Sequence, residues 1–358
     1  MHFEQITTEN PVLAQMMVRG EGAAWRITSR TVEAQQVLAE YSAIPLTAET
    51  YWLSRGAIVG LYERTASPEL KQWLVATDRL WVVNGKTLHD ADGMIYGVLN
   101  VSPESFYNGD QVADVATMVA RAGEMLAKGA DVIEVGGQTT KPGFEAAGLE
   151  LTPTAEIDRI APVITGIKAQ YPEAIIAVDT YKYDVMVRAV ALGVDIINDV
   201  NGFLDDPRKA RFLADQQVGL LTMWNPRGET VQNLQAEMHA WFEDNLAQLT
   251  AAGIDRQRIA LDPGVGYAKN SDVTQDLAMM NTIGHLQDLQ RPVMTAVSNK
   301  GWAKFLLGLP KLARADVSLV AATEMFQRGA RILRVHDVQS AKEMTQVVRA
   351  IAKSFWQK

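Results

Sequence analysis

The 358-residue sequence contains no cysteine. This absence excludes disulfide bonds, cysteine-ligated zinc, iron–sulfur clusters and a thiolate nucleophile. The sequence also lacks any run of eighteen apolar residues, and its first nineteen residues have no apolar segment of signal-peptide length. We therefore expect a soluble, cytoplasmic protein with no membrane partner.

Positive charge is scarce as well. Lys and Arg number 34 against 42 Asp and Glu, which gives a net charge of −8. Such a chain is a poor candidate for nucleic-acid binding through bulk charge, although a local basic pocket remains possible. With 47% apolar residues, it has ample material for one large domain or two ordinary ones.

From Met94 onward the sequence repeats one rhythm, in which a short apolar run precedes a segment with helical spacing of apolar residues. Short continuous apolar runs are typical of parallel strands buried on both faces. Several helical segments end at a glycine, as at Gly129, Gly193 and Gly329, which predicts left-handed C-caps. The predicted strands are Met94–Asn100, Asp131–Val135, Ala174–Asp179, Asp195–Asp199, Gly219–Met223, Ile259–Asp262, Pro292–Ala296 and Ile332–Val335.

Eight such units within residues 93–358 predict an α/β fold, a (β/α)8 TIM barrel, which takes about 250 residues. A doubly wound sheet is the competing architecture, but the turn after the first run has no G-x-G-x-x-G pattern. Residues 1–92 do not join the rhythm, and we expect an N-terminal extension or small α/β subdomain there. It should contain helices near 32–41 and 69–77 and a hairpin about Asn84-Gly85.

In a barrel of this kind, functional side chains lie at the C-terminal ends of the strands. Seven of the eight predicted strands end in hydrogen-bonding groups, whereas the fifth ends in Met223-Trp224-Asn225 and offers an apolar and aromatic surface. The polar set suits a planar heterocycle with a polar edge, and Arg with His suits phosphate oxygens. Its members are Asn100, Glu134, Asp179, Asn198 with Asp199, Asp262, Ser298 with Lys300, and Arg334 with His336.

Some of these residues also fit structural roles. Asp179 and Asp262 are compatible with strand-end caps that bond loop amides, and Glu134 with support of a neighbouring loop. Asp199 should face away from the mouth, because it follows Asn198 in an extended strand. Lys182 and Asp337 should form ion pairs or caps.

Six ordered motifs, each at a predicted strand end, resemble those of the dihydropteroate synthase family of pterin-binding barrels. The resemblance covers the chain from about Met94 to its C-terminus. The motifs are GVLNVSPESF at 97–106, GGQTTKPG at 136–143, VDTYK at 178–182, IINDVNG at 196–202, LDPGVG at 261–266 and RVHDV at 334–338.

The resemblance implies a transferase of folate biosynthesis that joins 6-hydroxymethyl-7,8-dihydropterin diphosphate to p-aminobenzoate and releases diphosphate. It implies Mg²⁺ as cofactor, with Asn100 as its protein ligand, and a homodimer formed through helices near the C-terminus. By motif position, the catalytic group comprises Asn100, Lys300, Arg334 and His336. The pterin edge would be bound by Asp179, Asn198, Asp262 and Lys300, and the diphosphate by Asn100, Arg334 and His336. The p-aminobenzoate site would be formed by Thr140, Lys141, Pro142 and Ser298, and the loop that carries Phe106 would close over the diphosphate.

Five positions depart from the family pattern. In the second loop, Gln138 replaces an acidic residue of the family. Lys141 and Asn299 each replace an arginine, Glu104 replaces an aspartate and Trp224 replaces a histidine. Lys does not reproduce the bidentate fork of Arg. An alternative is therefore a pterin-binding paralogue with weak or no synthase activity.

Other chemistries remain open from the residues alone. Lys300 could serve a lyase or aldolase as a Schiff-base amine, and Asp179 with Asp262 could form the acid–base pair of a hydrolase. A methyl-folate-binding methyltransferase barrel is similar in fold. The motif about Arg334 and the segment 138–143 fit the synthase better than they fit this methyltransferase.

Overall fold

A computed structural model of the chain describes residues 1–18, 21–28, 32–101, 114–138, 149–269 and 272–354. The chain divides into two compact units. One comprises Met1–Arg79 together with the chain from Thr345 onward, and the other comprises Leu80–Met344.

The larger unit is built on an eight-stranded sheet in which every pairing is parallel. The strand order is β12-β11-β10-β9-β8-β7-β14-β13, and a parallel bridge between Leu261 and Val293 joins the two edge strands. The sheet is therefore a closed (β/α)8 barrel, as predicted. Its strands are β7 (Met94–Asn100), β8 (Val132–Gly136), β9 (Ile175–Asp179), β10 (Ile196–Asp199), β11 (Gly219–Met223), β12 (Ile259–Asp262), β13 (Met294–Thr295) and β14 (Ile332–Val335).

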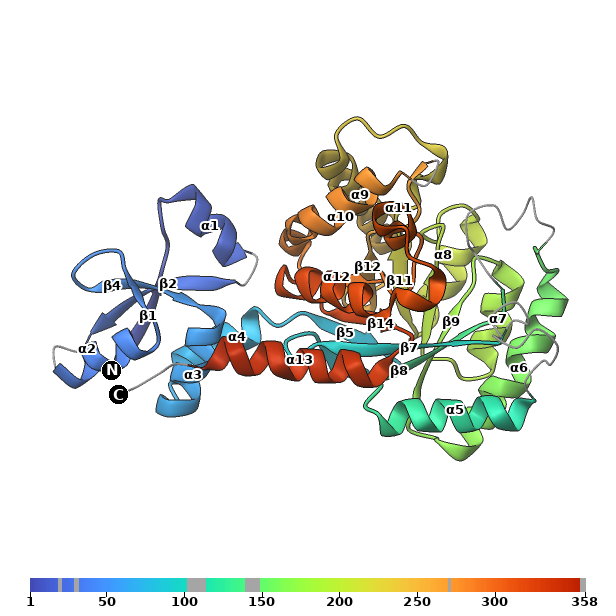
Figure 1. Ribbon diagram of the computed structural model, residues 1–358, viewed down its shortest axis with the longest axis horizontal. Helices are drawn as coiled ribbons and strands as arrows, with labels where there is room; N and C mark the ends of the chain where they lie inside the picture. The colour runs from blue at the N-terminus through green and yellow to red at the C-terminus, as the bar shows by residue number, and fades with distance from the viewer. Residues whose placement is uncertain (19–20, 29–31, 102–113, 139–148, 270–271, 355–358) are drawn as a thin grey trace. The chain divides into compact units, whose positions relative to one another are not determined.

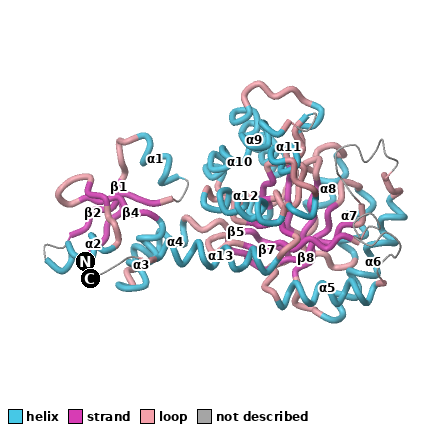
Figure 2. Tube along the Cα trace, in the orientation of Figure 1, coloured by secondary structure: helices cyan, strands magenta, loops and turns pink. Residues whose placement is uncertain are grey.

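Helices surround the barrel strands, as the cyan and magenta segments of Figure 2 show. Each strand is followed by at least one helix of the outer layer (Figure 1). These helices are α5 (Val115–Ala127), α6 (Pro153–Gln170), α7 (Tyr183–Ala191), α8 (Pro207–Ala214), α9 (Leu234–Ala251), α10 (Val273–Thr282), α11 (Trp302–Leu307), α12 (Ala315–Gln327) and α13 (Val338–Lys353). Short 3-10 helices are η2 (Pro226–Gly228), η3 (Arg256–Arg258), η5 (Ile283–Leu289) and η6 (Lys311–Ala313).

Local sequence explains where these helices begin and end. Asp114 and Thr152 accept hydrogen bonds from the first turns of α5 and α6, which satisfies backbone donors that the helix leaves unpaired. Gly129, Gly193 and Gly329 have φ angles of 95°, 82° and 98° in the turns that lead to the next strand. The predicted left-handed C-caps are confirmed.

A hairpin of β5 (Leu80–Val83) and β6 (Lys86–His89) covers the N-terminal end of the barrel. Asn84 and Gly85 form its turn with φ angles of 46° and 75°, as the sequence predicts. The Trp81 ring stacks on Tyr96 inside the barrel, with 6.5 Å between centroids, and its Nε1 donates to the carbonyl of Arg258 at 2.9 Å. The hairpin thus completes the bottom of the barrel core.

The smaller unit is an antiparallel sheet of order β1-β2-β4-β3 with helices packed on it. Its core includes the buried side chains of Phe3, Trp25, Leu53 and Leu61. Its elements are β1 (His2–Ile6), α1 (Pro11–Val18), β2 (Gly22–Thr28), α2 (Val32–Glu40), β3 (Ile44–Pro45), β4 (Thr50–Ser54), α3 (Arg55–Thr65) and α4 (Pro68–Ala76).

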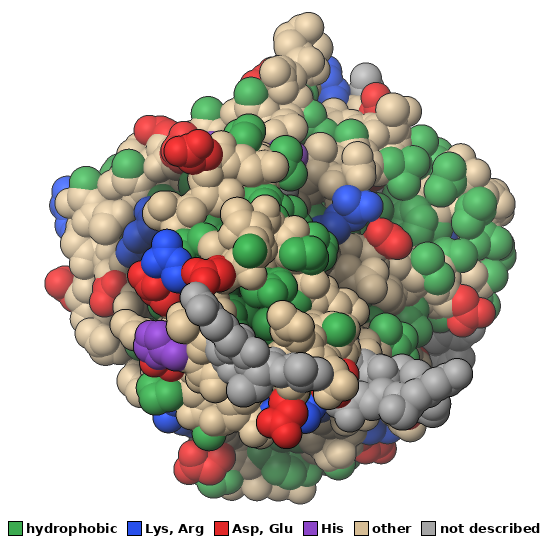
Figure 3. Space-filling model, turned by 90° about the vertical axis from the view of Figure 1, so that its left-hand side faces the viewer, with side chains coloured by type: hydrophobic (Ala, Val, Ile, Leu, Met, Phe, Trp, Pro, Cys, Tyr) green, Lys and Arg blue, Asp and Glu red, His purple; other side chains and the backbone are tan. Residues whose placement is uncertain are grey.

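The sequence predicts a domain boundary at residue 92 and a barrel over residues 93–358, whereas the larger unit comprises Leu80–Met344 and the chain from Thr345 onward belongs to the smaller unit. At the first boundary the difference is the hairpin, which breaks the strand–helix rhythm in sequence yet packs Trp81 and Val83 into the barrel core. Among the described residues, no helix combines the length and apolar character that crossing a bilayer requires. On the face drawn in Figure 3, acidic and basic side chains are interspersed among hydrophobic ones.

Candidate active site

Four side chains form one hydrogen-bonded group at the C-terminal end of the barrel. Arg334 on β14 donates from Nε to Glu134 Oε1 at 2.8 Å, and its Nη2 bonds the same oxygen. Arg334 Nη2 also donates to Asp179 Oδ2 on β9 at 2.9 Å. Asn198 Nδ2 on β10 donates to Glu134 Oε2 at 3.2 Å. The network links side chains of four strands, and the residues it joins lie up to 200 positions apart in the sequence.

Two oxygens of this group are buried and have no hydrogen-bond partner among the described residues. They are Asp179 Oδ1 and Asn198 Oδ1, and their residues are register partners on β9 and β10. Burial, reinforced by the negative charge of Glu134, raises the pKa of Asp179 to about 7. An unsatisfied buried acceptor is costly unless a ligand or an ordered water supplies a donor.

Asp262 and Lys300 lie at the same end of the barrel. Asp262 is 3% exposed, and its Oδ1 accepts from Gly264 N at 2.8 Å, so it also caps a loop amide. Lys300 Nζ donates to the carbonyl of Val265 at 2.6 Å. Burial raises the pKa of Asp262 and lowers that of Lys300, while each charge opposes the shift of the other.

The turn after β12 requires glycine. Gly264 has a φ of 77°, and a Cβ there would lie 2.0 Å from the carbonyl oxygen of Trp224. The chain therefore makes a tight turn at this point that only a residue without a Cβ can adopt.

Further along the rim, Ser298 Oγ lies 2.9 Å from His336 Nδ1. Asn100 ends β7 half-buried, with its Oδ1 3.2 Å from the position that a Cβ on Gly136 would take. Gly136 thus leaves room for the Asn100 amide over β8. Four predicted site residues, Phe106, Thr140, Lys141 and Pro142, lie outside the described residues, as does the substituted Glu104.

Gln138 belongs to a separate network beside the mouth. Its Oε1 accepts from Lys182 Nζ at 2.6 Å and from Leu151 N at 2.7 Å. Its Nε2 donates to the Tyr181 hydroxyl at 3.2 Å. Lys182 also forms a buried ion pair with Glu156 at 2.7 Å, which confirms the ion pair predicted for it.

The apolar surface at the end of β11 agrees in part with the sequence-based prediction. Met223 forms an apolar cluster with Val200 and Tyr267, with Tyr181 beside them, whereas Trp224 is 1% exposed and is not part of this cluster. Arg227 and Lys300 lie over the Tyr267 ring, 4.4 and 5.4 Å from its centroid. Sequence reasoning missed Tyr267, although it directly follows the turn 262–266.

Asp199 has the structural role expected of it. It is 0% exposed, and its carboxylate forms an ion pair with the buried Lys209 Nζ at 2.8 Å. It also accepts from the backbone amides of Asn201 and Phe203. Asp337 likewise accepts from Ser340 N at 3.1 Å in the first turn of α13, which confirms a cap.

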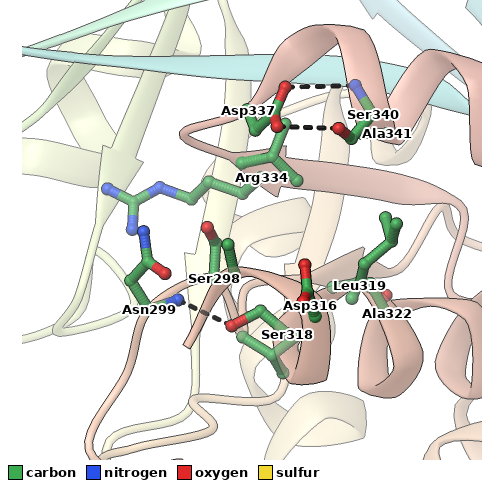
Figure 4. Close-up of a pocket in the computed structure, with 14 residues that line it drawn as sticks. Ser298, Asn299, Asp316, Ser318, Leu319, Ala322, Arg334, Asp337, Ser340 and Ala341 are labelled. Atoms are coloured by element: carbon green, nitrogen blue, oxygen red, sulfur yellow. Dashed lines mark hydrogen bonds between the residues drawn. The ribbon is translucent and has the colours of Figure 1, made fainter. Parts of the chain in front are cut away.

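A cavity of about 70 Å³ lies between the ends of β13 and β14 and helices α12 and α13 (Figure 4). Ser298 and Arg334 line it, but Figure 4 shows the Arg334 side chain extending away from Asp337 and Ser340. Asn299 N donates to Ser318 Oγ at 3.0 Å on its wall. The cavity therefore adjoins the mouth, while the Arg334 guanidinium bonds Glu134 and Asp179.

Comparison with known proteins agrees with this geometry. Residues 96–336 match the family model described as pterin binding enzyme. The chain is 31% identical over 266 residues to the dihydropteroate synthase of Streptococcus pyogenes, covering 74% of this chain and 97% of that protein. It is 33% identical over 258 residues to that of Bacillus subtilis, covering 72% of this chain and 88% of that protein.

Solved structures show the same likeness. The dihydropteroate synthase of Xanthomonas albilineans with 4-aminobenzoic acid superimposes with a TM-score of 0.71 at 30% identity, over 77% of this chain and 99% of that one. A structure of the Xanthomonas enzyme with 7,8-dihydropteroate gives a TM-score of 0.67 at 31% identity, over 75% of this chain and 97% of that one.

Proposed function

The chain belongs to the dihydropteroate synthase family of pterin-binding enzymes, and we propose that its barrel mouth joins 6-hydroxymethyl-7,8-dihydropterin diphosphate to p-aminobenzoate. The protein is a transferase of folate biosynthesis. In the proposed reaction the bond from the pterin methylene carbon to the diphosphate oxygen breaks. The arylamine nitrogen forms the new bond to that carbon and loses a proton, giving 7,8-dihydropteroate and diphosphate.

The pterin is assigned to the buried acceptors. The unpartnered oxygens of Asp179 and Asn198 are the observation that carries this assignment, because they need donors such as a ring N–H and an exocyclic amino group. Asp262 would supply a third acceptor, and Lys300 would donate to a ring carbonyl. With these interactions made, the reacting carbon is held in one orientation toward the arylamine.

The diphosphate is assigned to Arg334 and His336 on β14 and the loop after it. Within the described ranges, no group of three or more His, Asp or Glu side chains could hold a metal ion. Asn100 offers one neutral oxygen, which fits Mg²⁺ bound chiefly through substrate phosphate oxygens and water. When bound, Mg²⁺ would offset negative charge on the leaving diphosphate.

The p-aminobenzoate site is assigned to Ser298 and, by motif position, to Thr140, Lys141 and Pro142, with Phe106 closing over the diphosphate. The ring would contact the apolar cluster of Tyr267 and Met223. An arylamine is nucleophilic at neutral pH, and the dihydropterin can stabilise positive charge at the departing carbon. Positioning and electrostatic stabilisation therefore suffice, and no side chain has to act as nucleophile.

A direct assay tests the proposal. The purified chain is mixed with both substrates and Mg²⁺, and diphosphate release is followed together with dihydropteroate formation; reactions lacking p-aminobenzoate are the control. Turnover that depends on both substrates supports the synthase. Pterin binding without turnover supports the alternative of a paralogue with weak or no synthase activity, and failure to bind pterin contradicts both.

The proposal includes a homodimer. Helices α11 and α12 of the barrel unit, with η6 between them, expose Phe305 at 55%, Leu312 at 68% and Val320 at 66%. Exposed apolar side chains on adjoining elements favour a protein contact. Light scattering during size-exclusion chromatography tests it, with Leu312→Glu and Val320→Glu expected to give monomers. The cytoplasmic location stays a prediction.

A further inference from the structure

Glu134 accepts hydrogen bonds from three donors yet has no assigned role in the proposed reaction. Its carboxylate is 0% exposed at the middle of β8 and receives Arg334 Nε, Arg334 Nη2 and Asn198 Nδ2. One oxygen serves Arg334, and the other serves Asn198. Both acceptor atoms of the carboxylate are therefore engaged, one by β14 and the other by β10, each of which lies two strands away from β8 in the sheet.

This arrangement determines which end of the Asn198 amide faces the site. An ionised carboxylate only accepts hydrogen bonds, so Asn198 must turn its NH₂ group toward Glu134. The reversed amide would place two oxygens in contact in a buried position. Asn198 Oδ1, which has no partner among the described residues, is consequently left as the atom available to a ligand.

Arg334 determines which oxygen of Asp179 faces the site, as Glu134 does for the Asn198 amide. Its Nη2 bonds Asp179 Oδ2, which leaves Oδ1 buried and unpartnered within the described part of the chain. Asp179 and Asn198 are register partners on neighbouring parallel strands. Glu134 therefore holds, directly in one case and through Arg334 in the other, two adjacent side chains that present acceptors.

We propose that Glu134 is a positioning residue that sets the hydrogen-bond polarity of the pocket, so that it selects a ring edge carrying donors. The proposal rests on the proposed function, since the ligand concerned is the pterin. A 2-amino-4-oxo pterin offers such an edge. A lumazine, in which the 2-amino group is replaced by an oxo group, presents an acceptor there and is disfavoured.

The variant Glu134→Gln tests this polarity with almost no change of shape. The introduced glutamine would keep its Oε1 on Arg334 and turn its NH₂ toward Asn198, which would then reverse and point its own NH₂ into the pocket. We expect the affinity for 6-hydroxymethylpterin to fall by about 10- to 100-fold, in line with an unpaired buried polar group. The preference over 6-hydroxymethyllumazine should shrink by a similar factor.

The double variant Glu134→Gln with Asn198→Asp separates orientation from simple damage. The introduced aspartate would accept from the NH₂ group of the introduced glutamine and still present an oxygen to the ligand, and the total charge would equal that of the original chain. We expect pterin affinity to return to within about threefold of wild type. Damage to packing would instead add up in the double variant.

Binding is measured by titration calorimetry with both ligands, with thermal unfolding recorded for each variant. Loss in the single variant and recovery in the double variant support the proposal. Unchanged pterin affinity and preference in Glu134→Gln, or no recovery in the double variant, overturns it. A wild-type chain that binds neither ligand refutes the proposed function instead.

The variant Asn198→Asp alone covers the case in which Glu134→Gln does not fold. Two facing carboxylates must share a proton, so pterin affinity of this variant should weaken as pH rises from 6 to 9, in contrast to the increase expected for the wild type. A pH profile parallel to that of the wild type overturns the proposal.

Discussion

Arg334 Nη2 lies 2.9 Å from Asp179 Oδ2, so a cation on β14 and a carboxylate on β9 are paired across the mouth of the barrel. The pair is largely buried, with side-chain exposures of 19% and 10%. The same guanidinium also serves Glu134, so one cation faces two carboxylates. This excess of negative charge gives the mouth a measurable dependence on pH.

The stability of the ligand-free protein should fall as pH rises across the window set by Asp179. Burial, with the charge of Glu134, raises the pKa of Asp179 to about 7, so the folded state binds a proton that the unfolded chain releases near pH 4. The free energy of unfolding therefore decreases between about pH 4 and pH 7 and levels off above it. Urea denaturation of the wild type and of Asp179→Asn across this pH range isolates the contribution of Asp179. The same dependence of the unfolding free energy on pH in both proteins would contradict the prediction.

Pterin affinity should show the opposite trend. Asp179 accepts ligand donors best when it is ionised, and burial has raised its pKa to about 7. Affinity for 6-hydroxymethylpterin should thus increase from pH 6 to pH 8, as measured by fluorescence titration. The change should disappear in Asp179→Asn, which should bind about tenfold or more weakly at pH 8. A wild-type affinity that is constant with pH would show that Asp179 does not contact the ligand in this form.

Asp262→Ala should abolish most pterin affinity. The substitution removes a buried acceptor and the charge that opposes deprotonation of Lys300, whose pKa should fall further. We expect binding to weaken by about 100-fold. Asp272→Ala, on the exposed end of α10, is a matched control that should bind normally. Tight binding by Asp262→Ala would place the pterin elsewhere.

Lys209→Met should destabilise the protein without altering the site. It leaves the fully buried Asp199 without its cation, at a cost of about 3–5 kcal/mol. Arg208→Ala removes the exposed ion pair with Asp206 at the start of the same helix and should cost far less, because solvent screens exposed charges. Urea denaturation gives both values, and the folded fraction of Lys209→Met should keep wild-type pterin affinity. A similar cost in the two variants would disprove the distinction.

Trp81→Ala should open the bottom of the barrel. The side chain is 0% exposed, stacks on Tyr96 and donates to the Arg258 carbonyl, so its loss should cost about 3–5 kcal/mol. Leu88→Ala, on the partner strand and only partly buried, should cost less. The unfolding midpoint of the barrel in urea measures both. Equal midpoints for Trp81→Ala and wild type would mean that the hairpin is dispensable.

Much of the barrel was predictable because its signals are local. Buried parallel strands are short apolar runs, and the runs at 94–100, 219–223, 259–262 and 332–335 match β7, β11, β12 and β14. The hairpin turn at Asn84-Gly85 was equally clear in the sequence, but the surface on which the hairpin packs was not. Its packing depends on Trp81 meeting Tyr96 and Arg258, which no local pattern encodes.

The candidate site also has features that the sequence predicted and features that it did not. Which polar residues end each strand follows from the one-dimensional pattern, since parallel strands bring their C-terminal ends to one side of a barrel. Sequence reasoning left Glu134 between two roles and placed Trp224 at the mouth. The structure buries Trp224 and puts Tyr267 in the apolar cluster, because side-chain direction depends on how each loop leaves its strand.

The amino-acid order alone determined the alternation of strands and helices, the family motifs and the polar strand ends, because each depends on residues close in the chain. The tertiary structure decided which side chains form hydrogen bonds with one another at the mouth of the barrel. The bonds of Glu134 to Arg334 and Asn198 join residues up to 200 positions apart. Hydrogen bonds at such separations exist only once the barrel has closed, and they decide which atoms of Asn198 and Asp179 remain free to meet a ligand.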